Sequence, residues 1–186
     1  MRKIAFSYSP TGAGRKHYLT EEDVIVLLSR LPEELSERLR AVHFNDRALG
    51  RRCLGYVTTG HREITICALP QRVSLSSFIT HRSPLPFGAL RGRQWPEVAV
   101  RRFMLYDVFL HELGHLQIID PAAKRLQRRF ASETKAQEFA DEWREKLWSE
   151  SFDHLDPVHN RATSEELERL KQEPSARVLE SDASTA

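Results

Sequence analysis

Two histidines and a glutamate that could form a catalytic metal site lie close together in the stretch His111-Glu112-Leu113-Gly114-His115. Neutral imidazole is a good zinc ligand, and two histidines four residues apart on a helix lie one turn apart on the same side. A carboxylate beside them can take a proton from water, because a bound Zn²⁺ lowers the pKa of that water to about 7. The spacing therefore predicts that His111 and His115 bind one Zn²⁺ and that Glu112 acts as a general base.

The apolar pattern around these residues predicts a long helix that begins after Trp95-Pro96. Both histidines fall on one face of this helix, and we interpret that face as the buried one. Gly114 would let another backbone or a ligand approach closely, at a cost of about 1 kcal/mol in helix propensity. The alternatives are a chance match to this spacing, or a helix that merely carries two core histidines. The residues within about 60° of His111 on the helical wheel are Val100, Met104, Asp107, Val108, His115 and Ile118.

A third protein ligand is usual for catalytic zinc and is expected on the next long helix, over residues 130–148. Glu133 lies at the border of the apolar face of this helix, whereas Glu138 points to solvent. A carboxylate without a partner at the margin of a core is costly, and a metal would remove that cost. We therefore predict Glu133 as the ligand, and the alternative is a Glu133 that pairs with Arg129 on a solvated rim. The apolar face consists of Phe130, Ala136, Phe139, Ala140, Trp143 and Leu147.

The pentapeptide at residues 111–115 resembles the HExxH motif of the zincin superfamily. Glu133-x-x-Ala136 at short separation looks like the gluzincin pattern, and its extension to Phe139-Ala140 is similar to the ImmA/IrrE-type bacterial metallopeptidases. The resemblance covers residues 98–143, and this chain has Lys135 and Gln137 where many members have a second Glu and an Asn. It implies a zinc-dependent peptidase, in a family that often acts on a repressor or another regulatory protein, but the identity of the substrate does not transfer to this chain.

Two further roles have more than one candidate. Gln137 could accept a hydrogen bond from a zinc-bound imidazole and fix its tautomer, and Asp107, one turn before His111, competes for this role. Peptide hydrolysis also needs a donor to the oxyanion of the tetrahedral intermediate. His154 and His159 could fold back over the cleft, Tyr106 is a third candidate, and the alternative is that the two histidines lie on a surface loop.

The N-terminal part of the chain is predicted to form two helices. Thr20 is expected to be the N-cap of the first, because acidic residues follow it and an apolar run comes next. The second begins at Pro32 and is followed by a turn at Asn45-Asp46. The apolar stripe of the second helix consists of Leu35, Leu39 and Val42.

Residues 52–69 are predicted to form a β-hairpin with a turn at Thr59-Gly60-His61, because the second strand alternates between apolar and polar residues. A three-residue turn would set Cys53 opposite Cys67, with both thiols reduced. Residues 70–95 are rich in proline and glycine, and we expect them to form a loop that is one wall of a substrate cleft.

The C-terminal part contains several weaker signals. Asp120-Pro121 is expected to end the HExxH helix, because the residue before proline is pushed out of the α region. A short basic helix should follow, with a solvated charged face. Residues 163–172 are predicted to form a capped polar helix, and the last dozen residues look disordered. The basic cluster consists of Lys124, Arg125, Arg128 and Arg129.

Length and composition limit the remaining choices. A chain of 186 residues with 40% hydrophobic residues is long enough for one domain with a proper core. A net charge of +2 does not indicate a nucleic-acid partner. No apolar run approaches the roughly 18 residues that span a bilayer, and the N-terminus lacks the apolar segment of a signal peptide, so we expect a cytoplasmic protein without a membrane partner. The oligomeric state stays open.

Together these patterns predict a single α+β domain of zincin type over residues 1–162, with a small sheet, the HExxH helix and the helix that carries Glu133. A short polar helix and a disordered tail occupy residues 163–186. The predicted function is zinc-dependent hydrolysis of a protein or peptide substrate. One alternative is a non-catalytic zinc-binding regulatory or interaction module with a zincin fold, and another is a metal-free helical scaffold.

Overall fold

The computed structural model describes residues 4–46, 53–58, 60–79, 82–118 and 126–172, with the side chains of the last range from Ser132 onward. The strands are β1 (Ala5–Tyr8), β2 (Arg15–Lys16), β3 (Ala41–Asn45), β4 (Gly55–Thr58), β5 (Glu63–Cys67) and β6 (Leu69–Pro70). The α-helices are α1 (Glu21–Ser29), α2 (Glu33–Ser36), α3 (Glu97–Phe103), α4 (Leu110–Gln117), α5 (Leu126–Ser149) and α6 (Ser164–Gln172). A π-helical segment covers Met104–Phe109, and short 3-10 helices cover Ser76–Phe78, Leu85–Phe87 and Pro157–His159.

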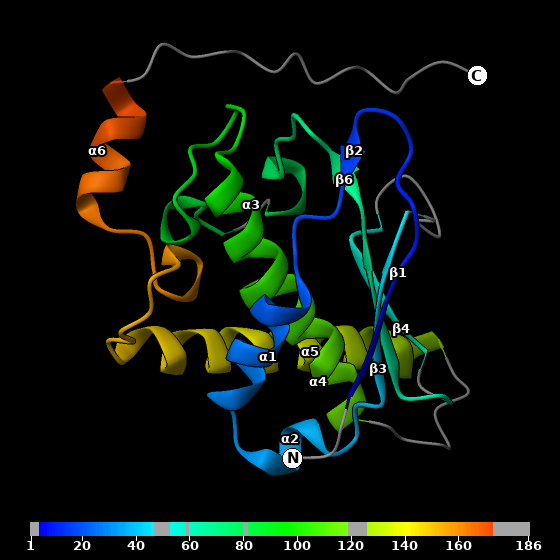
Figure 1. The fold of residues 1–186 in the computed structure, drawn as a ribbon. Coiled ribbons are helices and arrows are strands. Elements are labelled where there is room, and N and C mark those ends of the chain that lie inside the picture. Colours follow the sequence, from blue (N-terminus) through cyan, green and yellow to red (C-terminus); the bar gives the residue numbers. More distant parts are fainter. Residues whose placement is uncertain (1–3, 47–52, 59, 80–81, 119–125, 173–186) are drawn as a thin grey trace.

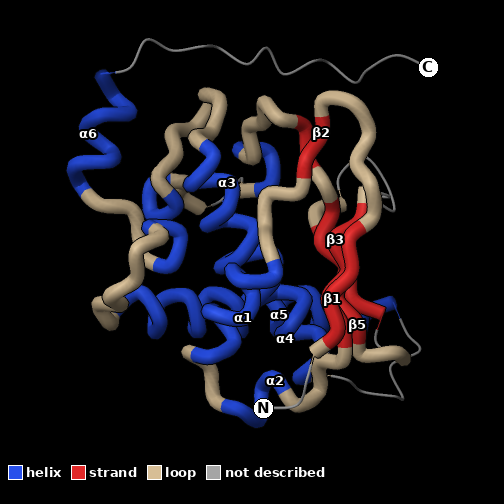
Figure 2. Tube along the Cα trace, viewed as in Figure 1, coloured by secondary structure: helices blue, strands red, loops and turns tan. Residues whose placement is uncertain are grey.

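A small mixed sheet has the strand order β1-β3-β5-β4, in which the first three strands are parallel and β4 is antiparallel to β5. Helices α1, α3 and α4 lie on one side of this sheet (Figures 1 and 2). Alternate residues of β3 and β5 are apolar and fully buried, which indicates that this face of the sheet packs against the helices. This combination of a small sheet and several helices is compatible with the α+β class.

Strands β1 and β3 correct the expectation for the N-terminal part. The second helix ends at Ser36, and Val42 lies on β3 rather than on a helical stripe. Residues 41–45 pair with β1 on one side and with β5 on the other, so non-local pairing overrides the weak helical pattern. The first helix is as predicted, because Thr20 caps α1 and its hydroxyl accepts a hydrogen bond from the Asp23 amide in a capping box.

The hairpin between β4 and β5 is confirmed, but its register differs by one residue from the prediction. Thr58 pairs with Glu63, and the amide of Cys67 donates to the carbonyl of Leu54, so Cys53 is not directly opposite Cys67. Arg62 adopts a φ of 60°, which adds a residue to the turn. Both thiols are free as expected, and burial raises the pKa of Cys67 to about 12.

The helix that carries the HExxH motif is continuous from Glu97 to Gln117 but is not uniformly α-helical. Its π-helical segment holds an extra residue in the turn, which changes the phase between the residues before and after it. The helical wheel at 100° per residue therefore fails across Met104–Phe109. The two histidines are half-buried, and the fully buried face of α4 carries Leu110, Leu113 and Leu116 instead.

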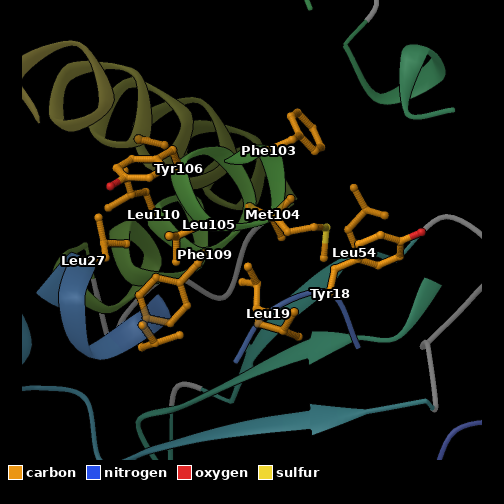
Figure 3. Close-up of a cluster of buried hydrophobic side chains, with 14 of the residues drawn as sticks. Tyr18, Leu19, Leu27, Leu54, Phe103, Met104, Leu105, Tyr106, Phe109 and Leu110 are labelled. Atoms are coloured by element: carbon orange, nitrogen blue, oxygen red, sulfur yellow. The ribbon is translucent and has the colours of Figure 1, made fainter. Parts of the chain in front are cut away.

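The hydrophobic core lies between the π-helical segment, α1 and the sheet (Figure 3). The π-helical segment is buried on all sides, because α1, β5 and α5 all contact it. Figure 3 shows Phe109 and Leu27 on the side of α1, and Met104 beside Leu54 and Tyr18. The core therefore fixes this helix from several directions immediately before the HExxH motif.

Helix α5 confirms the predicted helix over residues 130–148 and begins earlier, at Leu126. The backbone of Arg128 and Arg129 belongs to α5, so the expected separate basic helix is wrong for these two residues. The expected helix end at Asp120-Pro121, and Lys124 and Arg125, lie outside the described residues. Helix α6 confirms the predicted helix over residues 163–172, with a capping box between Thr163 and Glu166.

Within the residues that the structure describes, no helix is both long enough and apolar enough to cross a membrane.

Candidate metal centre

The structure brings His111, His115 and Glu133 together, two from α4 and one from α5. The Nε2 atoms of the two histidines are 3.1 Å apart, and Glu133 Oε2 is 3.2 Å from His111 Nε2. Glu133 Oε1 is 3.5 Å from His115 Nε2. Tetrahedral zinc with bonds of 2.0–2.2 Å holds its ligand atoms about 3.4 Å apart. The spacing of the three donor groups therefore fits a zinc ion between them.

Close packing of α5 on α4 places Glu133 opposite the histidines. A Cβ added to Gly114 would lie 3.0 Å from the carbonyl oxygen of Ala136 and 3.1 Å from its Cα. This confirms that Gly114 admits another backbone at close range.

At the end of α4, the guanidinium of Arg38 donates to the carbonyl of Leu116 at 3.1 Å, so a side chain satisfies this helix terminus.

Glu133 reaches the cluster and Glu138 does not, because Glu138 is exposed on another side of α5. The reason given for this choice needs correction, however. The side chain of Glu133 is 62% exposed, so desolvation at the margin of the core does not favour a metal there. What distinguishes Glu133 is its distance to the two imidazoles. The alternative pairing with Arg129 lies outside the side chains that the structure describes.

Replacing Gly114 with alanine tests the packing that positions Glu133. We expect Gly114→Ala to lower the free energy of unfolding by about 1 kcal/mol, because overpacking costs about 1–3 kcal/mol and alanine returns about 1 kcal/mol of helix propensity. Zinc affinity should fall as well, since α5 must move away from α4. Urea denaturation and zinc titration measure the two effects.

Gly60→Ala is the matched control, because nothing lies within 4 Å of an added Cβ at Gly60. It should change neither quantity. A Gly114→Ala protein with unchanged zinc affinity would show that the close contact with Ala136 does not set the position of Glu133.

Glu112 lies beside the cluster on α4 and is only 8% exposed. Burial raises the pKa of its carboxyl group to about 8, and the negative charge of Glu133 adds to this effect. A divalent cation between the histidines and Glu133 would act in the opposite direction, because it favours the carboxylate form.

The hydrogen-bond partners expected for the imidazoles are elsewhere. Gln137 Nε2 donates to Asp141 Oδ1 at 2.9 Å and to Asp107 Oδ1 at 3.4 Å. Asp107 is buried and accepts hydrogen bonds from two arginines. The prediction that Gln137 or Asp107 fixes an imidazole is therefore wrong. Sequence reasoning missed Ser132, whose Oγ is 3.3 Å from His115 Nδ1, although it directly precedes Glu133.

Asp107 is the centre of an ion-pair network that joins three parts of the chain. Arg82 pairs with Asp107 from the segment 70–95, and Arg144 Nη1 on α5 donates to Asp107 Oδ1 at 2.8 Å. Asp141 completes the network at 2.6 Å from Arg144 Nη2 and 3.2 Å from Arg82 Nη1. The network brings one residue of the expected cleft wall, Arg82, beside the helix turn before His111. In the sequence, the local signals of this network are the i,i+3 pair Asp141 and Arg144 and the i,i+4 pair Gln137 and Asp141.

The three candidates for oxyanion stabilisation make no hydrogen bond or ring contact with His111 or His115 among the described residues. Tyr106 and His159 are buried, and Arg30 donates to the Tyr106 hydroxyl at 3.0 Å and to the carbonyl of Leu147 at 2.5 Å. Leu147 is 14 residues after Glu133 on α5, so its contact with Arg30 lies about 20 Å along the helix from Glu133. The ring of His154 packs against His159 at 4.5 Å between centroids. The expectation that the segment after α5 folds over the cleft is therefore wrong.

Burial shifts the pKa values of two of these candidates, His159 and Tyr106. It lowers the pKa of His159 to about 4 and raises the pKa of Tyr106 to about 12. Both side chains are therefore neutral near pH 7. Arg30 on the C-terminal side of α1 donates to the Tyr106 hydroxyl and to the backbone carbonyl of His159, and this joins the segment after α5 to α1. We assign these residues to the stability of the fold.

The chain matches no protein-family model, no curated protein and no solved structure. The proposed function therefore rests on the arrangement of the residues in the structure.

Proposed function

We propose that this protein is a zinc-dependent metallopeptidase of zincin type, in which His111, His115 and Glu133 hold Zn²⁺ and Glu112 is the general base. The observation that carries the proposal is the set of three donor-atom separations, 3.1, 3.2 and 3.5 Å, with a buried carboxylate on the adjacent residue. Two imidazoles and one carboxylate are the ligand set of many catalytic zinc sites, which leave a fourth position open.

When bound, Zn²⁺ supplies a Lewis acid that polarises the scissile carbonyl and lowers the pKa of water. Glu112 removes a proton from the attacking water and then transfers it to the nitrogen of the leaving amine. The buried position of Glu112 limits competing hydrogen bonds from bulk water. Glu112 directly follows His111 on α4, and Glu133 is close enough to contribute to its raised pKa.

The sheet supports a peptide as the substrate class. Within the described residues β4 pairs only with β5, so its other side presents backbone donors and acceptors, and β4 packs on α4. An extended peptide can add to such an edge by main-chain hydrogen bonds. The resemblance to the ImmA/IrrE-type family suggests a repressor or another regulatory protein as the natural substrate.

A non-catalytic zinc-binding module is the second candidate, and one observation favours it. Among the described residues, no hydrogen bond or ring contact joins the three expected oxyanion donors to the two histidines. A protein that bound zinc without a donor to the oxyanion would lose a contribution that is often the largest in catalysis. The two candidates share the metal site and differ in turnover.

A digest of whole-proteome peptides with the wild-type protein and with Glu112→Gln separates these candidates. We expect the wild type to cleave a subset of peptides, and Glu112→Gln to lose at least about 100-fold in rate because it lacks the base. The variant should retain its zinc, since no ligand is changed, and zinc content measured on the same samples is the control.

Three outcomes matter in this experiment. Equal cleavage by the two proteins would overturn the role of Glu112. Zinc in both proteins without any cleavage would favour the non-catalytic module. A wild-type protein without zinc would overturn the proposed metal centre itself.

A further inference from the structure

The two histidines of the candidate metal centre differ in what surrounds their second ring nitrogen. Their Nε2 atoms face one another at 3.1 Å and both lie within 3.5 Å of Glu133, so Nε2 is the nitrogen of each ring that faces the metal position. His115 Nδ1 is 3.3 Å from the hydroxyl oxygen of Ser132. His111 Nδ1 is buried and has no hydrogen-bond partner among the described residues.

A neutral imidazole that binds a metal through Nε2 carries its proton on Nδ1, and an acceptor there fixes both the tautomer and the ring orientation. The hydroxyl of Ser132 can accept this proton, because a serine oxygen has two lone pairs. The distance of 3.3 Å is at the long end for such a hydrogen bond, and such contacts often tighten when the ligand is bound.

Ser132 and Glu133 are consecutive residues on α5, and both face α4. One helix therefore offers a ligand for the metal and an acceptor for a ligand from the other helix. The approach of α5 at Gly114 lies one turn further along, at Ala136, and holds the two helices in this relation. Ring orientation at His115 and ligand position at Glu133 thus depend on the same contact between helices.

We propose that Ser132 is a positioning residue that holds His115 in the tautomer protonated at Nδ1 and orients its ring for the metal. The inference rests on the proposed zinc site and adds a residue that does not touch the metal. His111 lacks an equivalent partner in the described residues, so the two zinc histidines are held unequally. Loss of the Ser132 hydroxyl should affect His115 and leave the ring of His111 unchanged.

The test compares Ser132→Thr with Ser132→Val, two side chains of nearly the same shape of which only threonine keeps the hydroxyl. Ser132→Ala is a third variant without a bulky group, and Ser149→Ala, an exposed serine on the same helix, is the control. Zinc affinity is measured by competition with a chelator. We expect Ser132→Val and Ser132→Ala to bind zinc about 10-fold more weakly, at the low end of the 10–100-fold effects of such partners. Ser132→Thr and Ser149→Ala should stay within about 3-fold of wild type.

A second measurement separates a positioning role from a merely structural one. In zinc-loaded protein labelled with ¹⁵N-histidine, the NMR shift and solvent exchange of the His115 Nδ1 proton should change in Ser132→Val and Ser132→Ala, while the His111 signals stay as in wild type. Threonine should restore the wild-type His115 signal.

The failures can be told apart. If the wild-type protein binds no zinc, the proposed function fails first. If the wild type binds zinc, and the valine and alanine variants match it in affinity and in the His115 signal, only the role of Ser132 is overturned. An equal change at both histidines would also contradict it, because that pattern indicates a general loosening of the contact between α4 and α5.

Discussion

Replacing Glu133 with alanine is expected to weaken zinc binding by roughly 100- to 1,000-fold, because a whole ligand is lost and zinc-binding free energies of about 10–16 kcal/mol are shared among four ligands. The wild-type protein should carry about one zinc ion per chain. Glu133 is the only carboxylate that the described residues bring into the cluster with His111 and His115. His111→Ala and His115→Ala should lose zinc to a similar extent. Chelator competition and metal analysis of the purified variants measure the effect.

Glu138→Ala is the matched control, because it removes the same side chain from an exposed position on the same helix. It should leave zinc affinity unchanged and alter the free energy of unfolding by no more than about 0.5 kcal/mol. If Glu133→Ala binds zinc as tightly as wild type, the assignment of the third ligand is wrong.

Replacing Asp107 with alanine should produce the largest loss of stability, about 3–5 kcal/mol, because it removes the buried partner of the Arg144 guanidinium and leaves Asp141, which is 39% exposed. The side chains of Asp107 and Arg144 are only 5% and 9% exposed, and Arg82 also pairs with Asp107. Since a domain is stable by only about 5–15 kcal/mol, this change removes a large share of the total. Urea denaturation followed by circular dichroism measures it.

Asp141→Ala is the control for the network, because Asp141 is 39% exposed and pairs with the same two arginines. Its loss should cost no more than about 1 kcal/mol, as for other exposed ion pairs. If Asp107→Ala is too unstable to purify, Asp107→Asn keeps the shape and removes the charge. A loss no larger than that of Asp141→Ala in both Asp107 variants would contradict a central role for this carboxylate.

The π-helical segment explains why the network could not be predicted. On an ideal α-helix, Asp107 shares a face with His111, and this made it a candidate partner for the imidazole. In the structure Asp107 lies within Met104–Phe109 and turns to Arg82 and Arg144. A π turn arises where surrounding packing forces an extra residue into the helix, and the local sequence carries no reliable sign of it.

Features that depend on residues close together in the chain could be predicted from the amino-acid sequence. The spacing of His111 and His115 sets them one turn apart on any helix, the acidic turn after Thr20 caps α1, and the period of residues 130–148 makes α5 a helix. In each case the energy that decides the outcome comes from neighbours within about four residues.

Contacts between residues far apart in the sequence could not be predicted, because they depend on the tertiary structure. Strand β3 exists because β1 and β5 pair with it on both sides, and Ser132 reaches His115 because Gly114 admits the backbone of Ala136. The predicted position of His154 and His159 was wrong because Arg30 holds the segment after α5 against α1 and the end of α5. These contacts join residues 17 to 129 positions apart, and their energies depend on how whole elements pack, which no local pattern of residues records.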